Sequence, residues 1–172
     1  MITLVLGGAR SGKSDYAEAL AAARPAPVVY IATGDPSGDD DFAARVAAHR
    51  RRRPAEWETI ESGPALAAAV RSQVGATLLI DSLGTWLASL PQFSADSDEL
   101  CAALVAYDGE VIVVSEEVGL GVHPSSDSGR RFRDALGSLN RAVAEVAGDV
   151  FLVVAGRALP LQPATSVVPR LP

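Results

Sequence analysis

Residues 2–14 read Ile2-Thr3-Leu4-Val5-Leu6-Gly7-Gly8-Ala9-Arg10-Ser11-Gly12-Lys13-Ser14. The apolar run that opens this stretch is typical of a buried strand, and the residues that follow Ser14 can form a helix. Between strand and helix, eight residues match the pattern Gly-x-x-x-x-Gly-Lys-Ser: Gly7, Gly8, Ala9, Arg10, Ser11, Gly12, Lys13 and Ser14. In that context the pattern predicts a loop that binds the phosphate groups of a nucleotide.

The residue types in this loop suit phosphate chemistry. The glycines allow backbone N–H groups to curl around phosphate oxygens, and the helix N-terminus adds its positive dipole end. Lys13 supplies a positive charge for the β- and γ-phosphates, and the Ser14 hydroxyl is a ligand for Mg²⁺. The alternative interpretation is a glycine-rich turn that holds a lysine by chance.

Outward from the loop, short apolar runs alternate with stretches that can form helices. The expected strands are 2–6, 28–32, 77–80, 111–114 and 151–155, and the clearest expected helices are 14–23 and 129–147, with a shorter one at 65–70. Continuous apolar runs suit strands that are covered on both faces. Strands that alternate with helices predict an α/β fold with a mainly parallel sheet. Residues 34–40 and 119–129 have the composition of loops.

Composition limits the possible classes of protein. The chain has 172 residues and a net charge of −6, and it contains 11 prolines and one cysteine, Cys101. This length predicts one domain, residues 1–172, whose proline-rich tail, 160–172, we expect to be loosely held and without a helix. The acidic balance argues against a nucleic-acid partner. We expect no transmembrane segment, no signal peptide and a reducing, cytoplasmic location.

Two acidic residues follow expected strands. Asp81 ends the run Leu78-Leu79-Ile80-Asp81, and Glu117 follows Val114-Ser115-Glu116. Ligands of open α/β sheets bind at the carboxyl ends of the strands, so both residues are candidates for the site. Asp81 is the candidate partner of Ser14 in holding Mg²⁺. The alternative is that either acid only caps the element that follows.

The chain has two histidines, His49 and His123. Helical spacing would put His49 on one face with Arg45, next to the basic run 50–53. Neighbouring cations favour neutral imidazole, which is the nucleophilic form. From the residues alone, however, a solvent-exposed helix face is the preferred interpretation of His49, and an ordinary loop position that of His123.

Together these residues resemble a known family, the bifunctional adenosylcobinamide kinase / adenosylcobinamide-phosphate guanylyltransferases of cobalamin biosynthesis. The resemblance runs from Leu4 to about Leu161 in five blocks. These are the loop 7–14 with Ala17-Glu18; Tyr30 to Thr33 with Asp39 to Arg45, His49, Arg53-Pro54, Trp57, Thr59 and Glu61; Asp81 to Leu87; Glu117 to Val122 with Pro124; and Arg131 to Asp134 with Gly137 and Asn140.

The resemblance implies a RecA-like P-loop NTPase fold of three layers and two reactions. ATP or GTP phosphorylates adenosylcobinamide, and GMP then passes from GTP through a guanylyl-histidine to adenosylcobinamide-phosphate. It reverses the interpretation of His49, which becomes the covalent nucleophile beside Lys13. It also implies Mg²⁺, a homotrimer, and nucleotide contacts outside the loop at Thr33, Arg45, Arg53, Glu61, Asp81 and Glu117.

The chain departs from the family pattern at several positions. It has Glu116 where asparagine is usual, His123 where an aliphatic residue is usual, Phe42 in place of methionine, and Gln162 in place of a basic residue. The segment 87–100 is short, which bears on subunit and corrinoid contacts rather than on the phosphate chemistry.

Two other functions are compatible with the loop alone. A P-loop kinase of another small alcohol would leave His49 without a role and would form no GMP adduct. A regulatory NTPase module would bind nucleotide tightly and have no small-molecule acceptor. No short motif identifies the residues that contact the corrin ring or the nucleotide that the kinase step prefers.

Overall fold

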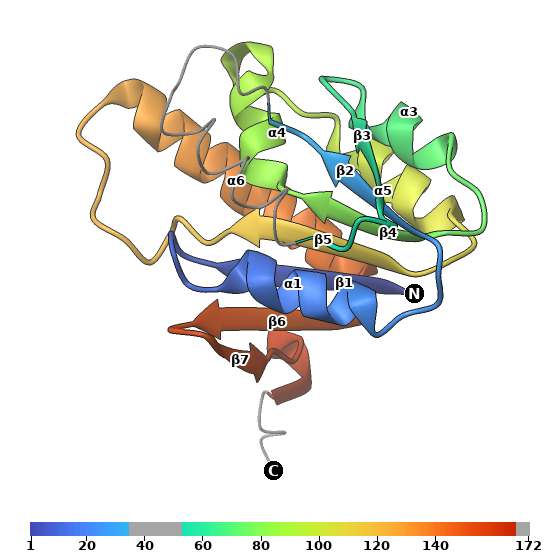
Figure 1. The fold of residues 1–172 in the computed structure, drawn as a ribbon. Helices are drawn as coiled ribbons and strands as arrows, with labels where there is room; N and C mark the ends of the chain where they lie inside the picture. The colour runs from blue at the N-terminus through green and yellow to red at the C-terminus, as the bar shows by residue number, and fades with distance from the viewer. Residues whose placement is uncertain (35–52, 168–172) are drawn as a thin grey trace.

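The computed structural model describes residues 1–34 and 53–167. Within these residues, seven strands form one sheet in the order β3-β2-β4-β5-β1-β6-β7 (Figure 1). The strands are β1 (Ile2–Gly7), β2 (Val28–Ala32), β3 (Glu58–Glu61), β4 (Thr77–Asp81), β5 (Val111–Glu116), β6 (Asp149–Val154) and β7 (Arg157–Pro160). All neighbours pair in parallel except β6 and β7, which pair antiparallel. The predicted mainly parallel sheet is confirmed.

Helices cover both faces of the sheet, as a three-layer fold requires (Figure 1). One face packs against α1 (Lys13–Ala22) through a core that includes Val5, Ala17 and Ile112. The larger core on the other face involves α3, α4, α5 and α6. These helices are α3 (Leu66–Arg71), α4 (Leu83–Ser89), α5 (Ser97–Ala106) and α6 (Asp127–Val146), with short 3₁₀ segments η1 (Pro91–Phe93) and η2 (Ala164–Val167).

The residues of the central strands explain this layering. β1, β2, β4 and β5 have buried side chains along almost their whole length, which is the pattern of strands covered on both faces. α6 is strongly amphipathic and buries Leu136, Leu139 and Val143 against the sheet. No helix in the described ranges is long and apolar enough to cross a membrane.

The structure corrects three boundary predictions. α6 begins at Asp127, because the Ser126 side chain accepts a hydrogen bond from the Gly129 backbone, so the loop before it ends earlier than expected. The tail begins as sheet rather than as loose chain, since Pro160 ends β7 and the Leu161 backbone donates to Val150. Beyond it, 164–167 form a single 3₁₀ turn where no helix was expected. Of the expected loop 34–40, residues 35–40 lie outside the described part.

Candidate active site

The phosphate loop leaves the carboxyl end of β1 and leads into α1. Gly12 caps the helix with φ 91°, a left-handed conformation that favours glycine. The loop closes on itself through a hydrogen bond from the Ser11 backbone N–H to the Gly8 carbonyl, 3.3 Å long. The turn between β6 and β7 braces it, because the Gly156 backbone N–H donates to the Ser11 carbonyl over 2.8 Å. Ala9 and Arg10 are exposed at its tip.

Lys13 is the first residue of α1 and is only 8% exposed. Its ammonium nitrogen lies 3.4 Å from the Gly8 carbonyl oxygen and 3.6 Å from Oε1 of Glu116. The ammonium group of Lys13 is therefore buried against the loop that carries it. This is the lysine that the sequence pattern predicts to bind phosphate. Ser14 follows it in the first turn and is half-buried.

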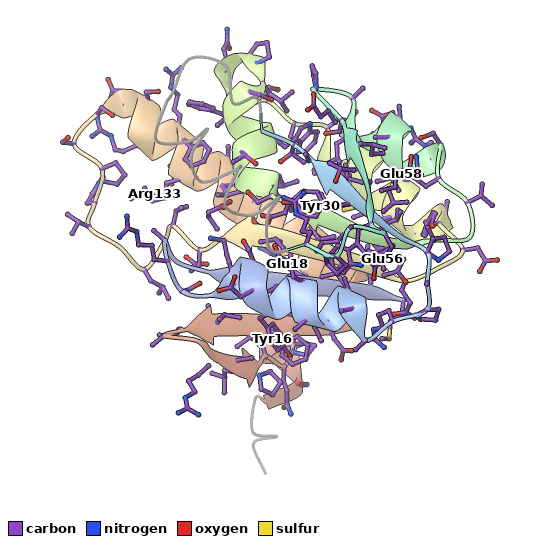
Figure 2. The ribbon with its side chains drawn as sticks, viewed as in Figure 1. Tyr16, Glu18, Tyr30, Glu56, Glu58 and Arg133 are labelled. Carbon is purple, nitrogen blue, oxygen red and sulfur yellow. The ribbon has the colours of Figure 1, made fainter. Side chains whose placement is uncertain are left out.

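Asp81 is the last residue of β4, and β5 separates that strand from β1. Its Oδ2 accepts a 3.0 Å hydrogen bond from the hydroxyl of Tyr30. Burial, and then the Asp81 charge, raise the pKa of this phenol well above its ordinary value. The Arg53 guanidinium lies 3.2 Å above the Tyr30 ring, close enough for a cation–π contact. Tyr30 lies on the face of the sheet that α1 covers, near Glu18 (Figure 2).

The other predicted site residues are distributed as follows. Thr33 is 4% exposed, and its hydroxyl donates to the Ser82 carbonyl and accepts from the Ser82 N–H, at 2.7 and 2.8 Å. This contact fixes the turn that follows Asp81. Glu117 lies beside the loop, since its N–H donates to the Gly7 carbonyl, and its carboxylate accepts from the Gly119 N–H.

Three of the predicted site residues are remote from the loop or lie outside the described part. Glu61 is exposed at the end of β3, which β2, β4 and β5 separate from β1. Arg45 and His49 lie outside the described residues. Sequence reasoning missed Glu116 as a site residue, although it directly precedes the chosen Glu117. It also missed the roles of Tyr30 and Ser82, although both stand in blocks that resemble the family, Tyr30 within an expected strand and Ser82 just after one.

Ser14 and Asp81 offer oxygen ligands of the kind that Mg²⁺ prefers. No group of three or more His, Cys, Asp or Glu side chains that could hold a metal occurs within 1–34 and 53–167. A magnesium ion that binds with a nucleotide needs only one or two protein carboxylates, because phosphate and water oxygens complete its shell. The donor set therefore fits the ion.

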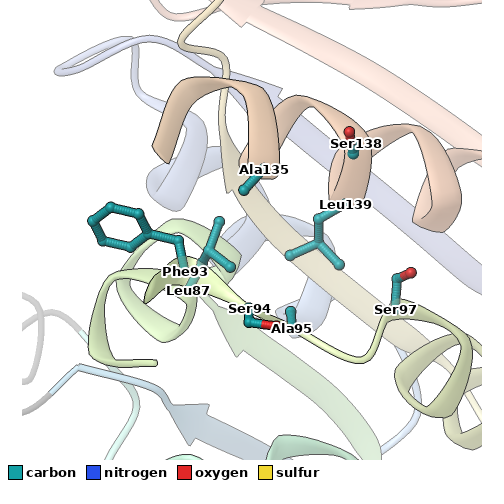
Figure 3. A pocket seen from close by; sticks show the side chains of 8 residues that line it. All are labelled: Leu87, Phe93, Ser94, Ala95, Ser97, Ala135, Ser138 and Leu139. Carbon is teal, nitrogen blue, oxygen red and sulfur yellow. The ribbon is translucent and has the colours of Figure 1, made fainter. Parts of the chain in front are cut away.

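A hollow of about 230 Å³ lies away from this loop, between α4, η1 and α6 (Figure 3). Its lining includes Leu87, Phe93 and Leu139 and shares no residue with the phosphate loop. These elements pack on the face opposite α1. The hollow is therefore separate from the candidate active site.

Comparison with known proteins identifies the family. A profile of the family described as cobinamide kinase / cobinamide phosphate guanyltransferase matches residues 3–161. This chain belongs to the cobinamide kinase / cobinamide phosphate guanyltransferase family. The resemblance and the enzyme class expected from the sequence are confirmed.

Relatives of this cobinamide kinase family match almost end to end. The bifunctional adenosylcobalamin biosynthesis protein CobP of Pseudomonas aeruginosa is 45% identical over 170 residues, which cover 94% of this chain and 98% of the relative. The bifunctional adenosylcobalamin biosynthesis protein CobU of Escherichia coli is 34% identical over 177 residues, which cover 91% of this chain and 97% of CobU.

Solved structures support the fold alone. The flagellar accessory protein FlaH from Methanocaldococcus jannaschii aligns with a TM-score of 0.52 at 13% identity, covering 91% of this chain and 74% of FlaH. An ATPase from the type III secretion system of pathogenic bacteria also aligns with a TM-score of 0.52, at 12% identity. The alignment covers 88% of this chain and 50% of the ATPase. Both likenesses confirm the expected P-loop NTPase fold.

Proposed function

We propose that this enzyme phosphorylates adenosylcobinamide with ATP or GTP and then converts the product to adenosylcobinamide-GDP with GTP. The observation that carries the proposal is the buried Lys13 at the head of α1, in a chain whose relatives are named bifunctional adenosylcobalamin biosynthesis proteins. One domain serves both reactions, so the corrinoid binds at the same sheet edge or between subunits.

In the kinase step, the acceptor is the aminopropanol hydroxyl of adenosylcobinamide. Its oxygen attacks the γ-phosphorus, the bond to the bridging oxygen breaks, and the hydroxyl proton is released. Lys13 and the loop N–H groups stabilise the charge on the transferring phosphoryl group and on the departing nucleoside diphosphate, ADP or GDP. Ser14 and Asp81 would hold Mg²⁺, which supplies charge neutralisation on the phosphate oxygens when bound.

In the guanylyl step, His49 is the nucleophile. Its neutral imidazole nitrogen attacks the α-phosphorus of GTP, the bond to the β-phosphate oxygen breaks, and pyrophosphate leaves. A phosphate oxygen of adenosylcobinamide-phosphate then attacks the same phosphorus, and the nitrogen–phosphorus bond breaks. A covalent nucleotide splits one transfer into two displacements. Thr33, Arg45, Arg53, Glu61 and Glu117 are the proposed further nucleotide contacts.

The decisive experiment traps the covalent nucleotide. The protein is incubated with Mg²⁺ and GTP labelled at the α-phosphorus, denatured, and analysed for retained, acid-labile label. We expect labelled wild-type protein and no label on His49→Ala. The matched control is His123→Ala, which removes the other histidine from an exposed loop position and should label like wild type. Equal labelling of wild type and His49→Ala would overturn the guanylyl-histidine.

The proposed assembly rests on the family resemblance, and the proposed location rests on the composition of the chain. We infer a homotrimer in the cytoplasm, where the single thiol, Cys101, stays reduced. Sedimentation equilibrium measures the oligomeric state directly, and a monomer at micromolar concentration would contradict the trimer.

A further inference from the structure

Glu116 occupies a position between the phosphate loop and the expected metal ligand. It ends β5, the strand between β1 and β4, and its register partner on β1 is Gly7, the first residue of the loop. Its Oε1 lies 3.6 Å from the Lys13 ammonium nitrogen. Its backbone is fixed as well, because the Asn140 side chain donates to its carbonyl over 3.0 Å. The carboxylate is thus placed against the lysine by sheet register.

A second set of contacts ties Glu116 to the end of β4. The Ser82 hydroxyl lies 2.9 and 3.1 Å from the two carboxylate oxygens and donates to them. Ser82 directly follows Asp81 and also caps α4. Space for the carboxylate comes from Gly84, where a Cβ would collide with Oε2 of Glu116. The carboxylate therefore bridges Lys13 and the turn that carries Asp81.

This arrangement has an electrostatic consequence for ligand binding. Lys13 is buried, so the Glu116 carboxylate partly compensates its charge before any nucleotide arrives. An incoming phosphate must then share the lysine with a carboxylate of its own sign, which disfavours binding. A divalent cation on the phosphates offsets that repulsion, because it brings positive charge to the same place. A metal-free nucleotide has no such compensation.

We propose that Glu116 is a specificity-determining residue that makes the site select the Mg²⁺ complex of a nucleotide over the metal-free nucleotide. The proposal rests on the nucleotide site of the proposed function. It concerns a carboxylate that lies outside the phosphate loop and is not part of the loop's sequence pattern. It assigns Glu116 an action on binding selectivity, separate from the transfer chemistry of His49.

The test measures nucleotide affinity with and without the metal. GDP is the probe, since it has no transferable γ-phosphate and releases no pyrophosphate. Dissociation constants are measured by calorimetry in Mg²⁺ and in EDTA for wild type and Glu116→Gln, which keeps the shape and an acceptor for Ser82. We expect Glu116→Gln to lower the dissociation constant of metal-free GDP about tenfold, which corresponds to about 1.4 kcal/mol. The dissociation constant of Mg²⁺–GDP should change far less.

Three further variants keep the result interpretable. Glu116→Asp retains the charge and should keep the wild-type selectivity, whereas Glu116→Asn is a second neutral variant and should behave like Glu116→Gln. Glu99→Gln removes the carboxylate of a half-exposed ion pair with Arg71 and should leave both affinities unchanged. Thermal unfolding checks that each variant is folded.

The outcomes separate this proposal from the function itself. Equal ratios of metal-free to metal-bound affinity in wild type and both neutral variants would overturn the role of Glu116, as would weaker metal-free binding in those variants. Wild-type protein that binds neither GDP nor GTP with Mg²⁺ would overturn the nucleotide site, and with it the proposed function.

Discussion

At the scale of single residues, Tyr30 connects an anion to a cation inside the sheet. Its hydroxyl donates to Asp81, and its ring lies beneath the Arg53 guanidinium. Tyr30 is 4% exposed and Asp81 is half-buried, so the hydrogen bond is partly shielded from water. A hydrogen bond to a charged group contributes about 1.5–3 kcal/mol. Tyr30 therefore orients Asp81, and its protonation state matters for stability.

We predict that the free energy of unfolding falls at alkaline pH and that part of this loss comes from Tyr30. Its pKa in the folded state lies above its ordinary value of 10.0, because of burial and then the Asp81 charge. Above about pH 10, the unfolded phenol loses its proton while the folded one keeps it, so rising pH favours unfolding. Urea unfolding at pH 8–11 should show a smaller alkaline loss for Tyr30→Phe than for wild type.

The control for this prediction is Tyr107→Phe. That change removes a hydroxyl that donates to the Ala76 backbone carbonyl, not to a carboxylate. Identical alkaline slopes in wild type and Tyr30→Phe would contradict the assignment.

At the scale of elements, α4 and α6 offer a matched pair of helical glycines. A Cβ at Gly84 in α4 would collide with the Glu116 carboxylate, whereas one at Gly137 in α6 would meet nothing within 4 Å. We expect Gly84→Ala to lower the free energy of unfolding by about 1–3 kcal/mol, as overpacking does. Gly137→Ala should raise it by about 0.5–1 kcal/mol. Chemical denaturation measures both, and equal effects would show that the Glu116 carboxylate is free to move.

The burial of the strands explains in large part which of them could be predicted from the sequence. The five apolar runs became β1, β2, β4, β5 and β6. The first four are buried along almost their whole length, whereas β6 carries an apolar run although only Val153 in it is fully buried. The two missed strands, β3 and β7, are the outer strands of the sheet. Their side chains are mostly exposed, so Glu58-Thr59-Ile60-Glu61 and Arg157-Ala158-Leu159-Pro160 carry no apolar run. α4 and α5 were not among the expected helices, although the side chains that cap them, Ser82 and Asp96, are readable in the sequence as N-cap residues.

The candidate site was predictable in part for a related reason. The phosphate loop is contiguous, so its residues and their strand–loop–helix setting were readable directly. The contacts of Glu116 with Lys13 and Ser82 join three segments, and only the register of β1 against β5 brings them together. Without that register, the sequence pointed to Glu117 rather than to Glu116. The role of His49 stays a prediction.

At the scale of the whole molecule, the charge distribution is informative. The net charge is −6, yet the loop requires positive charge for an anionic substrate. In the sequence, positive charge is available from Lys13 and Arg10 of the loop, and from Arg45 and the run 50–53 around His49. The structure adds a carboxylate, Glu116, directly against Lys13. The site therefore combines both signs of charge, in agreement with our proposal that it selects a metal–nucleotide complex over the metal-free nucleotide.

This combination predicts how nucleotide binding stabilises the whole fold. A ligand at 100 times its dissociation constant adds about 2.7 kcal/mol to the free energy of unfolding. For a chain of this size, the midpoint of thermal unfolding should rise by about 5–10 °C with GDP and Mg²⁺. Asp81→Asn removes the expected metal ligand but keeps a neutral acceptor for Tyr30. The nucleotide-free variant should therefore lose only about 1 kcal/mol of stability, the difference between a charged and a neutral hydrogen bond, while the Mg²⁺-dependent part of the shift is lost. Calorimetric scans with GDP, in Mg²⁺ and in EDTA, measure that part directly. An undiminished Mg²⁺-dependent shift in Asp81→Asn would exclude Asp81 as the metal ligand, because a carboxylate that binds the ion cannot be neutralised without weakening its complex.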